Sequence, residues 1–188
     1  LGTRKLVTYS TALLIFPLLG WSFAVRSPST PYVALLILAF LSGIGGGVFS
    51  GFMPSTSYFF PKSKQGLALG IQAGVGNFGV SIIQFFTPII VGSAMFGATL
   101  GAPQRFVDEV KGIDKSVWYQ NAGLVWVPFV ILSVLISWKF LKSVPVTSRG
   151  IKDQLDIFNN RHTWLMTVLY FMTFGTFAGF SAQFGLLI

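Results

Sequence analysis

A polar, glycine-rich stretch, GIQAGVGNFGVSIIQFFTP (70–88), interrupts a long segment that is otherwise apolar. Within it, the amide of Asn77 can donate two hydrogen bonds and accept others without carrying a charge. An unpaired amide is costly in hydrocarbon, and a polar contact between membrane helices contributes only about 0.6 kcal/mol on average. Polar groups deep in a membrane span therefore indicate a substrate path. The pattern predicts that Asn77 binds a polar, weakly hydrated ligand in a shielded cavity.

Gly66, Gly70 and Gly74 are spaced four apart and form a row of small residues on one helix face. Glycine in a helix interior costs about 1 kcal/mol relative to alanine, but small residues four apart let two helix backbones approach closely. We expect helix packing by Gly70, Gly74, Gly76 and Gly79. A second row, Gly43, Gly47 and Gly51, has Phe49 as the one bulky residue among small ones, and packing is the favoured interpretation there too.

An aromatic row lies near the end of the sequence, in YFMTFGTFAGFSAQ (170–183). Residues three or four apart share one helix face, so Tyr170, Phe174, Phe177 and Ser181 face the same way. Such a row usually packs in a core, and the pattern alone leaves a role in lining a cavity open.

Several kinds of chemistry are excluded or disfavoured by composition. There is no cysteine, and no Asp, Glu, His, Lys or Arg lies deep in an apolar segment. A proton relay or a cation site built from embedded carboxylates is therefore absent from this sequence. His162 beside Arg161 is expected at a membrane interface, and the carboxylates within 98–117 are expected in a solvated loop. We predict no metal, no cofactor and no catalytic residue.

The apolar segments that carry these residues are long enough to cross a membrane. Of 188 residues, 53% are hydrophobic and 10% are charged, and the mean hydropathy is +0.72. A membrane helix needs about 20 apolar residues, so the sequence predicts an all-α polytopic membrane protein. The expected spans, with a bend at Pro88, are 6–25, 32–53, 66–97, 118–139 and one that starts near Thr163.

The basic residues indicate topology rather than nucleic-acid binding. The net charge is +8, yet all 13 Lys and Arg lie between or at the ends of the spans. Nine of them lie on one side and four on the other, and the positive-inside rule assigns the richer side to the cytoplasm. The expected cytoplasmic loops are 54–65 and 142–162, and the expected opposite loops are 26–31 and 98–117.

The segment AGVGNFGVSIIQFFTP (73–88) resembles the nitrate signature of the nitrate/nitrite porter family of the major facilitator superfamily. LGTRKL (1–6) resembles the end of the superfamily's cytoplasmic motif between its second and third helices. Val80 departs from the signature, where a further glycine is frequent. The resemblance implies a fragment of the major facilitator fold, about helices three to seven of twelve. Residues 1–141 would then belong to the N-terminal six-helix bundle, 142–162 to the cytoplasmic inter-domain loop, and 163–188 to the start of the C-terminal bundle.

The same resemblance implies a function and a set of binding residues. Members exchange nitrate and nitrite by alternating access across the bacterial inner membrane, and we expect a monomer in membrane lipid. Two arginines that hold the anion lie on the family's second and eighth helices, outside this sequence. The remaining positions that match the family's binding residues are Phe49, Asn77, Tyr170 and Phe174.

Two alternatives stay open. A major facilitator transporter of another small solute would lack the arginine pair in its complete sequence. A membrane anchor or assembly subunit without transport would need packing glycines, but not an asparagine with polar neighbours.

Overall fold

A computed structural model describes residues 2–97, 100–109, 112–143 and 155–187. They form two units, Leu1–Pro145 and Val146–Ile188, each described by itself. The first unit contains helices α1 (Thr3–Leu13), α2 (Ile15–Ala24), α3 (Tyr32–Ser57), α4 (Lys62–Val91), α5 (Asn121–Leu124) and α6 (Val127–Phe140), and strands β1 (Gln104–Asp108) and β2 (Ile113–Val117). The second contains a 3-10 helix, η1 (Asp156–Asn159), and α8 (Arg161–Leu187).

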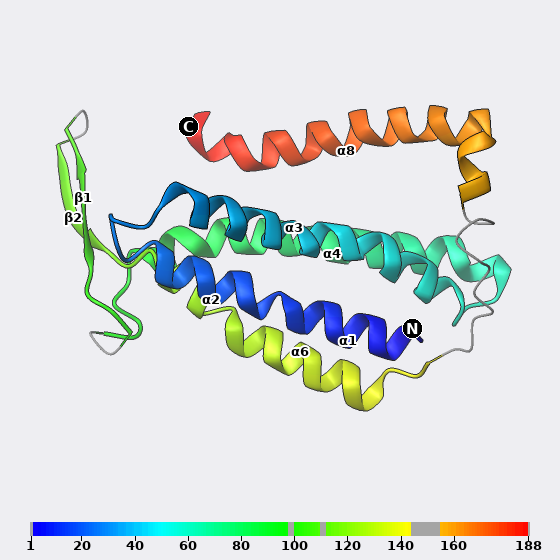
Figure 1. The fold of residues 1–188 in the computed structure, drawn as a ribbon, viewed down its shortest axis with the longest axis horizontal. Coiled ribbons are helices and arrows are strands. Elements are labelled where there is room, and N and C mark those ends of the chain that lie inside the picture. The colour runs from blue at the N-terminus through cyan, green and yellow to red at the C-terminus, as the bar shows by residue number, and fades with distance from the viewer. Residues whose placement is uncertain (1, 98–99, 110–111, 144–154, 188) are drawn as a thin grey trace. The chain divides into compact units, whose positions relative to one another are not determined.

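The helices of the first unit run back and forth along one direction (Figure 1). In this unit, α1 packs against α6, and α3 packs against both α2 and α4. The hairpin of β1 and β2 lies at the end of the unit where α2 and α4 finish, and the start of α1 lies at the opposite end. Successive loops therefore alternate between the two ends.

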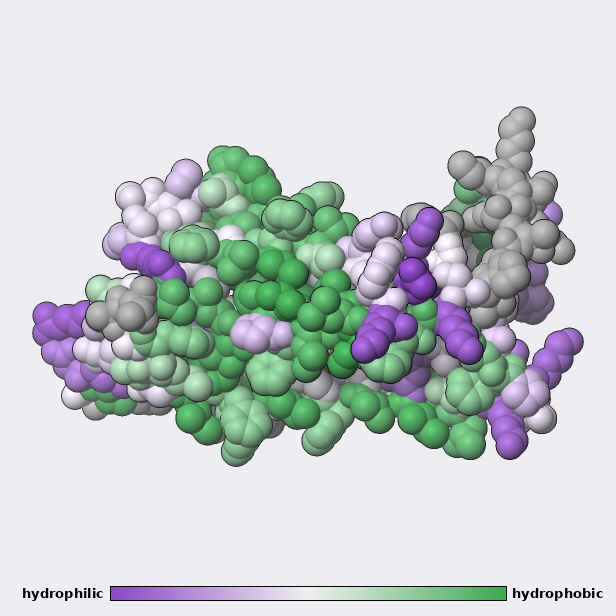
Figure 2. All heavy atoms as spheres, turned by 90° about the horizontal axis from the view of Figure 1, so that it is seen from below, coloured by the Kyte–Doolittle hydropathy of each residue, from purple (hydrophilic) through white to green (hydrophobic). Residues whose placement is uncertain are grey.

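Five helical segments are long and apolar enough to cross a membrane: Thr3–Ala24, Tyr32–Ser57, Lys62–Val91, Asn121–Phe140 and Arg161–Ser181. Their apolar side chains face outward, and among the described residues only Ile90 and Val117 are buried hydrophobic residues. Figure 2 shows apolar side chains over the middle of the visible face and hydrophilic ones at its two ends. Such a surface suits hydrocarbon in the middle and water at the ends, which confirms the predicted all-α membrane class.

Two of the five segments are broken by proline. Pro17 has no N–H to bond the Leu13 carbonyl, and the first segment is interrupted at Leu14, between α1 and α2. Pro128 likewise cannot bond the Leu124 carbonyl, and α5 ends there before α6 begins at Val127.

Two predicted spans have wrong boundaries. The span expected at 66–97 is α4, which begins at Lys62 after Pro61 and ends at Val91 before turns at 92–97; Pro88 lies inside the helix. The span expected from Trp118 begins at Asn121. Because residues 62–65 are polar and residues 92–97 and 118–120 are uncharged, hydropathy alone does not mark these boundaries.

The segment 98–117, predicted to be a loop, contains an antiparallel hairpin in which Gln104 pairs with Val117 and Asp108 with Ile113. Gly112 at the turn has φ +63°, a conformation that favours glycine. Arg105 Nε donates to Asp114 Oδ1 at 3.0 Å. This hydrogen bond lowers the pKa of Asp114 and raises the pKa of Arg105, so the pair is fully ionised at neutral pH.

The predicted orientation is testable with cysteines placed at the two ends of the first unit. Ser63 in the first turn of α4 and Ser116 in β2 are both exposed, and this chain has no cysteine. In intact cells, Ser63→Cys should resist an impermeant thiol reagent, while Ser116→Cys should react. If Ser63→Cys reacted before the cells were lysed, the predicted orientation would be wrong. The loop 142–162 is expected on the side of Ser63, and its residues 144–154 lie outside the described residues.

Candidate functional site

Asn77 lies at the middle of α4, fifteen residues after Lys62 and fourteen before Val91. Its side chain is half-buried and makes no hydrogen bond to any residue that the structure describes. An amide in the middle of a membrane helix needs a partner, because hydrocarbon supplies none. The structure therefore leaves the donors of Asn77 available to a ligand or to a neighbouring helix.

The glycines around Asn77 leave one side of α4 open. A Cβ added to Gly70, Gly74, Gly76 or Gly79 would meet no atom within 4 Å in the first unit. Their predicted packing role stays a prediction, because no described residue of this unit packs on them. In the second row, a Cβ on Gly51 would lie 3.3 Å from Leu6 Cδ2, while one on Gly43 or Gly47 would be in open space.

Phe49 lies on α3, the helix that packs against α4. Its side chain is half-buried. Phe49 and Asn77 are thus on adjacent helices. The first unit supplies these two of the predicted binding residues.

Tyr170 and Phe174 are stacked on α8, with ring centroids 5.4 Å apart and planes 7° from parallel. Phe177 continues the row, 6.2 Å from Phe174. All three rings are exposed, Phe174 by 42%. The row is an aromatic face of the second unit, in which the structure joins Tyr170 with Phe174.

Gln72 is a polar group on α4 to which the sequence analysis gives no role. Its Oε1 atom is buried without a hydrogen-bond donor among the described residues. A buried carbonyl oxygen left unpaired costs about 1–3 kcal/mol, so a donor from outside the described residues would be stabilising. The sequence does contain a signal that could have identified Gln72 as a candidate polar group, because this glutamine lies in the same glycine-rich stretch as Asn77.

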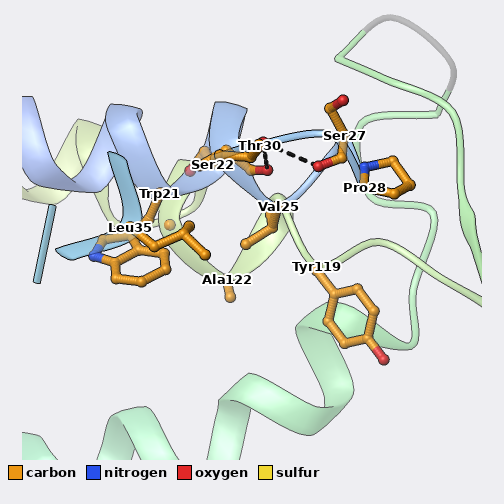
Figure 3. A pocket seen from close by; sticks show the side chains of 11 residues that line it. Trp21, Ser22, Val25, Ser27, Pro28, Thr30, Leu35, Tyr119 and Ala122 are labelled. Carbon is orange, nitrogen blue, oxygen red and sulfur yellow. Dashed lines mark hydrogen bonds between the residues drawn. The ribbon is translucent and has the colours of Figure 1, made fainter. Parts of the chain in front are cut away.

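One cavity of the first unit has no features of an anion site. It has a volume of about 560 Å³ and lies where α2, α3 and α5 meet near the hairpin (Figure 3). Two of the hydroxyls that line it donate to backbone carbonyls: Ser22 to Leu18 at 2.8 Å and Thr30 to Ala24 at 2.7 Å. No charged side chain lines this cavity, so it offers no opposing charge to an anion.

The described residues contain no group of three or more His, Cys, Asp or Glu that could hold a metal ion. The candidate binding groups of the first unit are an uncharged amide, half-buried on a glycine-rich helix, and the Phe49 ring on α3. Those of the second unit are the aromatic rings on α8. These groups can donate hydrogen bonds and exclude water, and they suit reversible binding of a small planar solute.

Comparison with known proteins agrees with this description. The chain is 62% identical over its full length to the probable nitrate/nitrite antiporter NarK2 of Thermus thermophilus, and it covers 42% of that protein. It is 39% identical over 99% of its length to the nitrate/nitrite transporter NarU of Escherichia coli K12, of which it covers 39%. It is 29% identical over 96% of its length to the nitrite extrusion protein of Bacillus subtilis 168, again covering 39%.

The chain thus spans about two fifths of the length of these curated relatives. The family model of the Major Facilitator Superfamily matches residues 1–187, which is nearly all of the chain. Together with the five apolar helical segments, this match establishes a multi-pass membrane protein, and the chain belongs to the Major Facilitator Superfamily.

Proposed function

We propose that the complete protein transports nitrate and nitrite across the bacterial inner membrane, exchanging one for the other. The names of the relatives support this substrate class. Within the chain, the observation that carries the proposal is the amide of Asn77, which lies unpaired at the middle of α4 within the nitrate-signature segment.

The chemistry of the anion explains why such a group is suitable. Nitrate and nitrite are small and planar, and their charge is spread over the oxygens. An uncharged amide can donate hydrogen bonds to these oxygens without holding the anion so strongly that release becomes slow. In this proposal the opposing positive charge comes from two arginines on helices outside this chain.

The aromatic rings and the glycines complete the proposed mechanism. Phe49 and Phe174 close over the two faces of the anion and exclude water, and Tyr170 supports Phe174 through its stacked ring. Gly70, Gly74, Gly76 and Gly79 let α4 slide against its neighbours as two halves rock around the site. Residues 1–141 belong to one half, residues 163–188 begin the other, and 142–162 join them on the cytoplasmic side. The protein acts as a monomer and transforms no substrate.

Ligand binding to the purified complete protein tests the substrate class. A ligand at a hundred times its Kd stabilises the folded state by about 2.7 kcal/mol, so nitrate and nitrite should each raise the unfolding temperature in a concentration-dependent way. Chloride, formate and acetate at equal ionic strength should not. Stabilisation by an organic anion or an uncharged solute, with no response to nitrate, would favour a transporter of another solute. No response to any solute would favour the membrane anchor.

A further inference from the structure

The start of α1 and the end of α6 meet at the end of the first unit that lies away from the hairpin. A Cβ added to Gly2 would lie 2.7 Å from Ser143 Oγ. The guanidinium carbon of Arg4 lies 4.5 Å from the centroid of the Trp138 ring, and that ring lies 6.4 Å from the ring of Tyr9. These contacts gather four basic residues, the α1–α6 basic cluster: Arg4, Lys5, Lys139 and Lys142.

The charge of the α1–α6 basic cluster is not balanced within the described part of the first unit. None of its four members makes an ion pair with any residue described there. The acidic residues described in this unit are Asp108, Glu109 and Asp114, and all lie in the hairpin segment at the other end (Figure 1). Like charges that share one place repel one another, so this end of the unit favours an anionic partner.

An apolar surface adjoins the cluster. On α6, the side chains of Leu132, Leu135 and Ile136 are 53%, 60% and 48% exposed. They lie two to six residues before Trp138, on the membrane side of the charges. Trp138 itself is at the position where tryptophans mark the boundary between headgroups and hydrocarbon. A free phosphate would use only the charges, whereas a phospholipid would contact both the charges and this apolar surface.

We propose that the α1–α6 basic cluster binds the headgroup phosphate of an anionic phospholipid, whose acyl chains lie along the apolar surface of α6. The Arg4 guanidinium lies over the Trp138 ring, and its N–H groups can donate two parallel hydrogen bonds to the phosphate. The lysines act as point charges around the headgroup. This inference concerns the lipid boundary and holds whichever solute the protein transports.

Lipid binding to the complete protein can be measured by native mass spectrometry with added dioleoyl phosphatidylglycerol or dioleoyl phosphatidylcholine. A basic residue near an anionic lipid surface contributes about 1 kcal/mol, which is about a five-fold change in affinity. Lys139→Gln with Lys142→Gln should therefore weaken phosphatidylglycerol binding about 25-fold. Binding of phosphatidylcholine should hardly change.

The pair Lys62→Gln with Lys64→Gln is the matched control, because both lysines are exposed and lie at the turn between α3 and α4. This control should retain phosphatidylglycerol binding within about two-fold, and Lys139→Arg with Lys142→Arg should retain it as well. If both double glutamine variants lost phosphatidylglycerol affinity equally, the proposal would be overturned, since any exposed basic residue would then bind the lipid equally well. Displacement of the lipid by inorganic phosphate would also overturn it, because the apolar surface would then contribute nothing.

Discussion

Replacing Asn77 with alanine should weaken nitrate binding to the complete protein by about 5- to 150-fold. A hydrogen bond to a charged group contributes roughly 1–3 kcal/mol, and 1.4 kcal/mol corresponds to a factor of ten in Kd. The variant should fold and express, because the Asn77 side chain makes no hydrogen bond to the residues that the structure describes. Titration of the purified variant with nitrate measures the change directly.

Two further variants separate a binding role of Asn77 from a structural one. Asn77→Ser replaces the amide with a hydroxyl, which can still donate one hydrogen bond. This variant should therefore lose less affinity than Asn77→Ala. Asn77→Asp keeps the shape of the side chain but replaces the donors with a negative charge, so it should lose more at neutral pH. If Asn77→Ala binds and transports nitrate as the wild type does, Asn77 has only a structural role.

The single variants Phe49→Ala and Phe174→Ala should each reduce transport severely. The double variant should be little worse than either single variant. Both rings are proposed to close over one anion. The ring faces carry the negative part of the quadrupole and do not attract an anion, so their main effect is to keep water out and to strengthen the charge interactions. Once Phe49→Ala has let water into the site, the charge interactions are already weakened, and Phe174→Ala can weaken them little further. The two losses in binding free energy should therefore not add.

Leucine at either position should retain more activity than alanine, because it still fills part of the space. Phe171→Ala is a suitable control: its ring is 77% exposed on the same helix as Phe174, and it should change transport little. Additive losses in binding free energy, or an active double variant, would show that the two rings do not enclose one site. The assignment of Phe174 would then be given up first.

The helices themselves were largely predictable because their signals are local. The start of α3 at Tyr32 was predicted to the residue, since Pro28 and Pro31 interrupt the chain just before it. The end of α4 was not. Long-range contacts hold the chain at that point: the backbone N–H of Trp118 donates to the Val91 carbonyl at 2.8 Å, and Asn121 Nδ2 donates to the Ser93 carbonyl at 3.0 Å.

The hairpin had a weaker signal that the charges obscured. QRFVD and IDKSV contain the aromatic and β-branched residues that strands favour, but their polarity does not alternate, and the six charged residues within 105–115 indicated a solvated loop. Its position also depends on tertiary contacts, since Gln104 Nε2 donates to Gln120 Oε1 at 3.0 Å and Gln120 is almost fully buried.

The candidate site was predictable only one helix at a time. Periodicity places Asn77 at the middle of its span and puts Tyr170 and Phe174 on one face, where the structure finds them stacked. The proposed meeting of Asn77 and Phe49 with Phe174 depends on how the two units come together, and periodicity within one helix carries no information about that. The unpaired oxygen of Gln72 likewise depends on neighbouring helices rather than on its own segment.

Counterflow in proteoliposomes of the complete protein tests nitrate/nitrite exchange most directly. Vesicles loaded with unlabelled nitrite should take up labelled nitrate to well above the level reached in vesicles loaded with chloride, without an imposed proton gradient. In the same vesicles Asn77→Ala should reduce the initial rate at subsaturating nitrate in proportion to its lost affinity. Uptake of nitrate that is indifferent to internal nitrite and depends only on a proton gradient would contradict exchange, and no uptake under either condition would contradict nitrate transport itself.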